Sequence, residues 1–210
     1  LLNRMAALRM IRSDTLFALG GGVVGDLGGL AASLYMRGIG LVQLPTSLLA
    51  AVDSSVGGKT AIDLETGKNL VGTFYQPDLV LYDTETLATL PKEQLANGFG
   101  EIVKTGMIRD AKLFDAARKP DVGAAEIAEI VHGCVEIKRD VVRRDEKEMG
   151  LRQILNFGHT FGHAVEKCSG FSIPHGFCVA IGMMIITAAC AKRGICAPET
   201  FVQLSGALRR

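Results

Sequence analysis

The residues with the clearest chemical potential are histidines, three of whose four copies lie between positions 159 and 175 of this 210-residue chain. His159 and His163 are four residues apart, a spacing that places both imidazoles on one face of a helix and lets them point into one cleft. His175 follows in the segment IPHG, and Glu101 in GFGEIVKTG supplies a carboxylate. Neutral imidazole is the commonest protein ligand for zinc, and a catalytic zinc usually has three protein ligands and one open position. The pattern therefore predicts a His₂Glu metal site, and the alternative is a hydrogen-bonded histidine pair in an apolar core.

A second chemical signal is the glycine-rich segment GGGVVGDLGG, which follows the apolar run Thr15–Leu19. A strand, a glycine turn and a helix in this order aim backbone N–H groups at a phosphate. The spacing of Gly20, Gly22 and Gly25 is a weak match to the dinucleotide fingerprint. Asp26 follows in the first turn of the expected helix and could accept a hydrogen bond from a ribose or an amide. The alternative is a tight turn that lets helix and strand pack closely.

Lys59, in the segment SVGGKTAID, is a candidate anion-binding lysine. The segment is not a Walker A loop, because Asp53 stands where that motif requires its upstream glycine. The alternative is an exposed surface lysine, the usual state of this residue.

Composition narrows the class of protein. Hydrophobic residues make up 48% of the chain, and 23 basic against 22 acidic residues give a net charge of +1, which argues against a nucleic-acid or membrane-surface partner. The five cysteines form no CxxC pair, so we expect reduced thiols in a cytoplasmic protein. The apolar run 179–191 contains Gly182 and is too short to span a bilayer, so we expect a buried core helix there. The chain starts inside a helical pattern without Met, and we expect it to be part of a longer protein.

The elements that must position these residues change in kind along the chain. Hydrophobic periodicity predicts a first helix over 1–12 and strands over 15–19, 39–44 and 79–82. Only helical patterns follow, over 92–107, 111–118, 124–145, 151–168, 177–193 and 198–209. The predicted fold class is thus an α/β portion over residues 1–90 followed by an all-α domain over residues 91–210.

Seven motifs, taken together and in one order, carry a family resemblance. They are GGGVVGDLGG, MRGI, QLPTSLLAAVDSSVGGKTAID, KNLVGTFYQP, GFGEIVKTG, RQILNFGHTFGHAVE and PHGFCVAIGM. From about Arg12 to about Gly194 the chain closely resembles the 3-dehydroquinate synthases of the sugar phosphate cyclase superfamily. The resemblance implies a Rossmann-like parallel-sheet portion that binds NAD, truncated here, followed by a helical domain that binds Zn²⁺ or Co²⁺. It also implies a cytoplasmic homodimer with a small-molecule substrate and no nucleic-acid or membrane partner.

The resemblance also assigns residues. It gives the metal to Glu101, His159 and His175, and it makes His163 a substrate-side residue, a distinction that spacing alone does not make. The positions that match the family's NAD contacts are Gly21, Gly22, Asp26, Thr46, Ser47, Asp53, Lys68 and Thr89. The positions that match its substrate and phosphate contacts are Arg37, Lys59, Asn69, Lys104, Lys138, Arg152, Asn156 and His163.

The implied reaction converts 3-deoxy-D-arabino-heptulosonate 7-phosphate to 3-dehydroquinate and phosphate in the shikimate pathway, with NAD regenerated in each cycle. Lys59 and Lys104 would hold the anionic substrate, and the guanidinium of Arg152 can grip a carboxylate or phosphate with two hydrogen bonds. His163 could relay a proton near neutral pH. The alternative for this basic set is a group of solvated surface side chains.

Two departures from the family pattern leave alternatives open. Phe177 stands where the family usually has Glu, two residues from His175, and the loss of a carboxylate there could change how that imidazole is oriented. The family's N-terminal strands and a C-terminal segment with a further active-site lysine are not in the chain. The alternatives are a related cyclase for another seven-carbon sugar phosphate, a polyol dehydrogenase, which would leave Lys59, Lys104 and Arg152 without a role, or an inactive module of the same fold.

Overall fold

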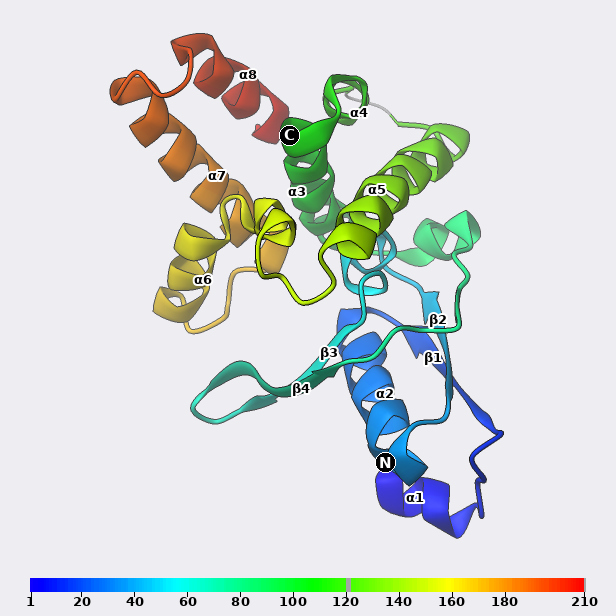
Figure 1. Ribbon diagram of the computed structural model, residues 1–210. Coiled ribbons are helices and arrows are strands. Elements are labelled where there is room, and N and C mark those ends of the chain that lie inside the picture. The colour runs from blue at the N-terminus through cyan, green and yellow to red at the C-terminus, as the bar shows by residue number, and fades with distance from the viewer. Residues whose placement is uncertain (120–121, 210) are drawn as a thin grey trace. The chain divides into compact units, whose positions relative to one another are not determined.

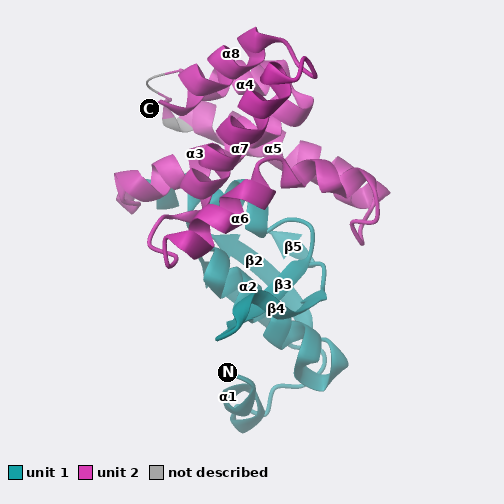
Figure 2. Ribbon diagram, turned by 90° about the vertical axis from the view of Figure 1, so that its left-hand side faces the viewer, with its two compact units in different colours: residues 1–88 teal, residues 89–210 magenta. Residues whose placement is uncertain are grey.

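The structure is a computed structural model that describes residues 1–119 and 122–209. Its contacts divide the chain into two compact units, Leu1–Ala88 and Thr89–Arg210 (Figure 2). The first unit contains a parallel sheet and the second is helical, which confirms the predicted fold class. That these units are the functional domains expected from the sequence stays a prediction.

The first unit is built on a three-stranded parallel sheet in the order β1-β2-β5 (Figure 1). Strand β1 (Thr15–Gly20) pairs with β2 (Gly40–Pro45) from Thr15↔Gly40 to Gly20↔Pro45, so both strands end at the same edge. The short strand β5 (Leu79–Val80) pairs with β2 on its other side. Helix α2 (Gly22–Leu34) connects β1 to β2 and packs on both.

Helix α2 lies close to its neighbours because its inner face carries glycine. A Cβ added at Gly28 would lie 3.0 Å from the Cβ of Ala18, and one added at Gly29 would lie 2.4 Å from Thr60 Cγ2. The small core beneath this helix is lined by Met5, Ala18, Ala31, Ala32, Ile39 and Leu41. Small residues here therefore fix the distance between helix and sheet.

The strand predicted over 15–19 is present, but its apolar side chains, which suggest a buried strand, are mostly not buried. Only Ala18 of β1 is buried, whereas Phe17 is 63% and Leu19 is 65% exposed. Side chains alternate between the two faces of a strand. Helix α2 covers one of these faces, and no other described element buries the second.

The remaining elements of the first unit include a hairpin that was not predicted from the sequence. Strands β3 (Lys59–Leu64) and β4 (Gly67–Phe74) pair antiparallel, from Lys59↔Phe74 to Leu64↔Gly67. The first helix, α1, covers only Leu2–Ala7 and is shorter than predicted. Short helical turns complete the unit at Tyr35–Arg37 (η1), Ala50–Ser54 (η2) and Thr84–Thr89 (η3), the last ending at the boundary.

The second unit consists of helices joined by short loops (Figure 1). They are α3 (Lys92–Arg109), α4 (Ala111–Ala117), α5 (Ala124–Arg144), the short turn η4 (Leu151–Asn156), α6 (His159–Cys168), α7 (His175–Lys192) and α8 (Pro198–Leu208). The predicted helix over 151–168 is therefore two elements. Gly158, with φ +81°, breaks it, because a left-handed residue cannot continue a right-handed helix.

Helix α7 is long and apolar enough to cross a membrane by length and composition alone, and a core helix of a globular unit meets the same criteria. Only 33% of this helix is buried, and Ile181 and Ile185 are 39% and 41% exposed. The expectation of a buried core helix is therefore only partly correct. Helices α3, α6 and α8 contact α7, and they leave part of its surface uncovered by the described residues.

Candidate metal centre

Three side chains from three helices of the second unit converge on one point. Glu101 lies in α3, His159 is the first residue of α6 and His175 is the first residue of α7. One oxygen or nitrogen atom from each lies within 4.8 Å of the other two. Nε2 of His175 is 3.4 Å and Nε2 of His159 is 3.8 Å from Oε1 of Glu101. A tetrahedral zinc site with bonds of 2.0–2.2 Å holds its ligand atoms about 3.3–3.6 Å apart. The donor set and its spacing therefore fit zinc or a similar divalent cation.

Glycine next to each of the three side chains allows this convergence. A Cβ added at Gly100 would lie 2.4 Å from the carbonyl oxygen of Gly176, so α3 and α7 touch through their backbones. Helices α6 and α7 do the same, because a Cβ at Gly182 would lie 1.9 Å from the carbonyl oxygen of Gly158. Glu101 and His159 directly follow Gly100 and Gly158, and His175 directly precedes Gly176. The closest backbone contacts of the unit therefore position the three candidate ligands.

Charge is buried at this point. Glu101 is 1% exposed and forms an ion pair with Lys104, one helical turn further along α3 and 2% exposed. A carboxylate and an ammonium removed from water must be paired, because an isolated charge in the interior is very costly. Burial acts to lower the pKa of His175, but hydrogen bonding and charge from Glu101, and then from Glu166, outweigh it, so this pKa is raised.

The Nδ1 atoms of His159 and His175 have different hydrogen-bond partners. Nδ1 of His159 lies 3.3 Å from the carbonyl oxygen of Phe157, and Nδ1 of His175 lies 2.9 Å from Oε1 of Glu166. In both rings this leaves Nε2 directed toward Glu101. A hydrogen bond at one ring nitrogen decides which nitrogen is available to a metal.

His163 takes a different place from the other two histidines. Its ring lies edge-on to that of His159, with centroids 5.3 Å apart, and it is exposed. It forms a second possible metal-ligating group with Glu166 and His175, and it does not belong to the group that contains Glu101. His159 and His163 therefore share a helix face, as their spacing predicts. Of these two histidines, only His159 lies next to Glu101.

The predicted substrate cations of the second unit are buried. Lys104, Lys138 and Arg152 are 2%, 9% and 1% exposed. The Nη1 of Arg152 donates to the carbonyl oxygen of Glu146 at 2.6 Å. In this arrangement the guanidinium is partly engaged by the protein's own backbone.

Asp145, which was not among the predicted site residues, organises the loop that carries Arg152. Its carboxylate accepts hydrogen bonds from the backbone N–H groups of Met149, Gly150 and Arg152 at 2.9, 2.8 and 2.9 Å. These bonds, that of Arg152 first, stabilise the ionised form and lower the pKa of Asp145.

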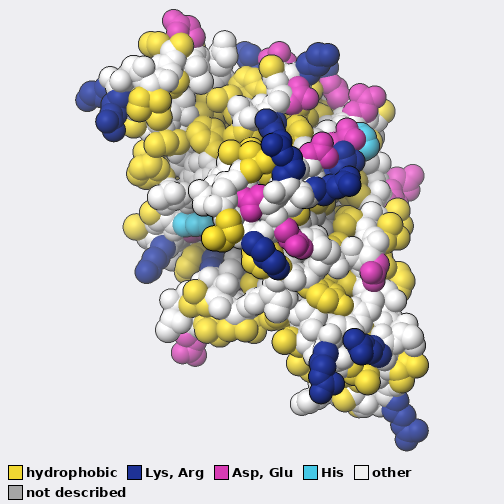
Figure 3. Space-filling view, in the orientation of Figure 1, with side chains coloured by type: hydrophobic (Ala, Val, Ile, Leu, Met, Phe, Trp, Pro, Cys, Tyr) yellow, Lys and Arg dark blue, Asp and Glu magenta, His cyan; other side chains and the backbone are white. Residues whose placement is uncertain are grey.

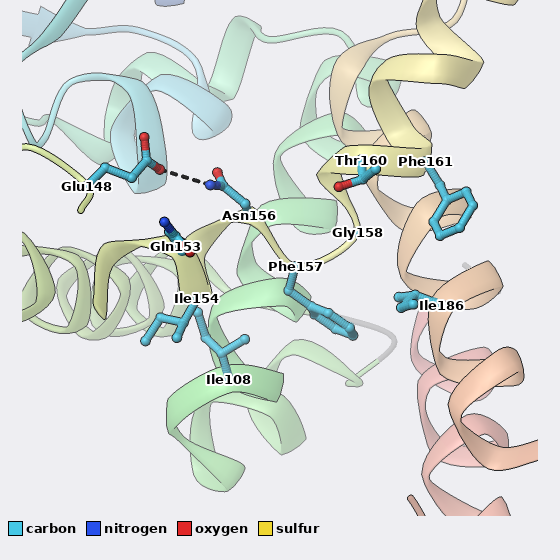
Figure 4. Close-up of a pocket in the computed structure, with 10 residues that line it drawn as sticks. All are labelled: Ile108, Glu148, Gln153, Ile154, Asn156, Phe157, Gly158, Thr160, Phe161 and Ile186. Atoms are coloured by element: carbon cyan, nitrogen blue, oxygen red, sulfur yellow. Dashed lines mark hydrogen bonds between the residues drawn. The ribbon is translucent and has the colours of Figure 1, made fainter. Parts of the chain in front are cut away.

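Asn156 lines a surface pocket of about 830 Å³ formed by η4, α3, α6 and α7 (Figure 4). Its amide donates to Oε1 of Glu148 at 2.9 Å. Apolar side chains of Ile108, Ile154 and Phe157 line the same pocket. Asn156 is exposed, so its amide is accessible to a small molecule.

In the first unit, part of the predicted NAD-binding set gathers where β1 and β2 end. Gly21 caps α2, and a Cβ placed on it would lie 3.5 Å from Ser47 Oγ. The N–H of Thr46 donates to the carbonyl oxygen of Gly20 at 2.9 Å, and a Cβ at Gly22 would lie 3.1 Å from Ser54 Oγ, next to Asp53. Asp26 lies one turn into α2. Ligands of open parallel sheets bind at this carboxyl edge.

Other predicted residues of the first unit lie elsewhere. Arg37 follows the far end of α2, about 20 Å along the helix from Gly22. Lys59 begins β3, whereas Lys68 and Asn69 lie at the turn end of the hairpin, about 15 Å away along the strand. Thr89 belongs to the second unit. Arg37 therefore lies away from the glycine turn, and Lys68 and Asn69 lie away from Lys59.

Charged side chains of both signs are interspersed on the face shown in Figure 3. This agrees with the near-zero net charge of the chain, although the charged side chains visible at the lower end of that face are Lys and Arg only.

Glu166 is the functional candidate that sequence reasoning missed most clearly. It is 3% exposed, and it lies seven residues after His159 and three after His163, on the same face of α6. Its helical spacing from His159 and His163 could have identified it from the sequence. It also corrects the concern about Phe177, because the carboxylate hydrogen-bonded to His175 comes from α6 and not from position 177.

Both halves of the chain match models of the same protein family. Residues 1–97 match the family model described as 3-dehydroquinate synthase N-terminal, and residues 98–210 match the one described as 3-dehydroquinate synthase C-terminal. A 3-dehydroquinate synthase of Clostridium perfringens is 47% identical over 99% of the chain. The chain spans 61% of that relative's length.

Two solved structures resemble the chain closely. A 2-deoxy-scyllo-inosose synthase, solved with carbaglucose-6-phosphate, NAD⁺ and Co²⁺, has a TM-score of 0.92 at 32% identity. A 2-epi-5-epi-valiolone synthase from Streptomyces hygroscopicus, with NAD⁺ and Zn²⁺ bound, has a TM-score of 0.91 at 30% identity. Each match covers 99% of this chain, and 58% and 60% of the respective structures.

Proposed function

The chain belongs to the 3-dehydroquinate synthase family, and on that premise we propose that the protein converts 3-deoxy-D-arabino-heptulosonate 7-phosphate to 3-dehydroquinate and phosphate. In this proposal it is a carbon–oxygen lyase acting on phosphates, with catalytic NAD and Zn²⁺ or Co²⁺. It works in the shikimate pathway of the cytoplasm, as a homodimer.

The observation that carries the proposal is the meeting of Glu101, His159 and His175. Two imidazole nitrogens and one carboxylate oxygen are the donor set of many catalytic zinc sites, which keep a further position open for substrate. When bound, the cation would supply Lewis-acid chemistry, lowering the pKa of substrate hydroxyls and stabilising a developing alkoxide. NAD would supply reversible hydride acceptance.

The protein's own residues bind and orient the substrate. Lys104, Lys138 and Arg152 are buried cations of α3, α5 and η4, and they match substrate contacts of the family. Desolvated cations attract an anionic sugar phosphate more strongly than exposed ones. Asn156 offers an exposed amide at its pocket, and Arg37, Lys59 and Asn69 complete the proposed substrate set from the first unit.

His163 is the proposed proton relay. Its imidazole is exposed and lies within 5.3 Å, centroid to centroid, of the His159 ring, so it can exchange a proton beside the candidate metal ligands without being one of the three.

The proposed NAD site uses the carboxyl edge of the sheet. Gly21 and Gly22 start α2, whose N-terminus favours a diphosphate. Thr46, Ser47 and Asp53 supply polar side chains at the same edge, and Asp26, Lys68 and Thr89 are assigned by family resemblance.

The test is direct. Purified protein is incubated with the heptulosonate phosphate, NAD and zinc, while inorganic phosphate and the carbocyclic product are measured. We expect equimolar release of both and no net reduction of NAD. Absence of phosphate release under these conditions would refute the proposed reaction.

The metal assignment has its own test in the 210-residue chain. His159→Ala should abolish stoichiometric zinc by elemental analysis, whereas His132→Ala should not, because His132 is exposed on α5 and belongs to neither possible metal-ligating group. Full zinc content in the His159 variant would overturn the ligand set.

A related cyclase activity is the second candidate, and Phe177 favours it because the usual Glu of the 3-dehydroquinate synthases is absent there. The two similar solved structures are such cyclases. The same assay with another seven-carbon sugar phosphate separates the two activities.

A further inference from the structure

The site contains a buried carboxylate that neither the metal nor the substrate set uses. Glu166 is 3% exposed, and its Oε1 lies 2.9 Å from Nδ1 of His175. We propose that Glu166 is a positioning residue, which fixes the His175 ring with its proton on Nδ1 so that the Nε2 lone pair is directed at the metal position. This inference rests on the proposed metal site.

The geometry of His175 supports the proposal first. The two nitrogens of an imidazole point in opposed directions, and a neutral ring carries one proton. Because an ionised carboxylate only accepts hydrogen bonds, the nitrogen facing Glu166 must be the donor. Nε2 then has its lone pair toward Glu101, whose Oε1 is 3.4 Å away.

The contrast between the two candidate histidine ligands supports it second. His159 donates from Nδ1 toward a backbone carbonyl, which no side-chain substitution removes, at 3.3 Å. His175 relies on a side chain for the same task, at the shorter distance of 2.9 Å. Carboxylate partners of metal-bound histidines set ring orientation and raise ligand basicity.

A competing use of Glu166 is a second metal site with His163 and His175, since these three also lie within 4.8 Å of one another. Because Glu166 faces Nδ1 of His175, that site would take Nδ1 as a ligand while Nε2 serves the first metal. One neutral ring with one proton cannot offer two lone pairs, so the two sites exclude each other. The distance of 2.9 Å between Oε1 and Nδ1 is that of a charge-assisted hydrogen bond, which favours the positioning role.

The chain contains a matched control. His132 and Glu136 form a second imidazole–carboxylate pair, with Nε2 3.6 Å from Oε2, but their side chains are 74% and 47% exposed. Water competes for an exposed pair, so that carboxylate should not fix a tautomer. Glu136→Gln is therefore the control for removal of one negative charge from the helical unit.

The first experiment needs no metal. Nitrogen-15 NMR of the four histidines in the chelator-treated chain, at a pH where the rings are neutral, reports which nitrogen carries each proton. We expect His175 to carry its proton on Nδ1, Glu166→Gln to retain this tautomer through its amide oxygen, and Glu166→Ala to shift it toward Nε2. A wild-type His175 with its proton on Nε2, or a tautomer unchanged in Glu166→Ala, would overturn the proposal.

The second experiment measures zinc affinity by competition with a chelator. We expect Glu166→Ala to weaken binding about 10- to 100-fold, Glu166→Gln to weaken it less, and Glu136→Gln to leave it unchanged. Equal affinities of wild type and Glu166→Ala would refute the positioning role. If wild type itself bound no zinc, the proposed metal site would fail, and the tautomer measurement would still decide the role of Glu166. If the alanine variant did not fold, the wild-type tautomer and the Gln variant would decide it.

Discussion

Replacement of Lys104 by Met separates the two ways in which the buried carboxylate of Glu101 can be neutralised. In the absence of metal the Lys104 ammonium is paired with that carboxylate, and both side chains are 2% exposed or less. Methionine is close to lysine in length and can fill the same space without charge. The variant therefore leaves a negative charge in the interior while changing packing little.

The expected cost follows from the burial of the pair. Removing one partner of a buried ion pair costs about 3–5 kcal/mol, because the other charge is left without compensation. Since about 1.4 kcal/mol corresponds to a factor of ten, amide exchange in α3 should accelerate about 100- to 4000-fold in chelator.

Zinc should reverse much of this loss. The pair of Glu101 and Lys104 is neutral, whereas Glu101 alone carries one negative charge, so a dication is attracted more strongly in the variant. Ligand at 100 times its Kd stabilises a protein by about 2.7 kcal/mol. Zinc should therefore slow α3 exchange more in Lys104→Met than in wild type.

The assay is hydrogen–deuterium exchange read by mass spectrometry, with and without zinc. The double variant Glu101→Gln/Lys104→Met is the control, since it removes both charges; it should lose less stability than the single variant and show no zinc response. Exchange in Lys104→Met within tenfold of wild type, or a double variant less stable than the single one, would refute the reasoning.

Two further substitutions test the helix packing and the loop that support the site. Gly176→Ala should destabilise the helical unit by about 1–3 kcal/mol or more and weaken zinc binding, because its Cβ would lie 1.8 Å from the carbonyl oxygen of Asn97. The control Gly206→Ala, with nothing within 4 Å of the added Cβ, should be neutral or stabilising by up to about 1 kcal/mol. Equal thermal midpoints of the two variants would contradict this expectation. Asp145→Asn should lower the thermal midpoint at neutral pH. Because the pKa of Asp145 is lowered by folding, its contribution is present above an unfolded-state pKa of about 3.9 and disappears as the pH falls through the folded value, so wild type and variant should converge in acid. A difference that persisted unchanged at low pH would contradict the role of that carboxylate.

The order of an α/β portion followed by helices was predictable because hydrophobic periodicity is a local property. The β3–β4 hairpin was missed because its first strand was interpreted only as an anion-binding loop around Lys59, although the segment Glu65-Thr66-Gly67 between two strand-like runs is a turn signal. The break at Gly158 was likewise readable from a glycine in the middle of a helical pattern.

The site was predictable in its residue types and less so in its partners. His159 and His163 share a face, as their spacing predicts, but the choice of His159 as the neighbour of Glu101 depends on α3, which lies far away in sequence. Glu166 could have been found from its helical spacing to His159. Its partner His175 could not, since that contact depends on how α6 and α7 pack.

The glycines adjacent to Glu101, His159 and His175 have a consequence for redesign. Because the helices meet through bare backbone at these points, the distances between the helices do not depend on which side chain stands next to each glycine. A softer or harder donor, such as Glu101→Cys or His175→Asp, would therefore meet the same geometry. Selectivity among cations could be engineered here one position at a time, with the architecture held constant.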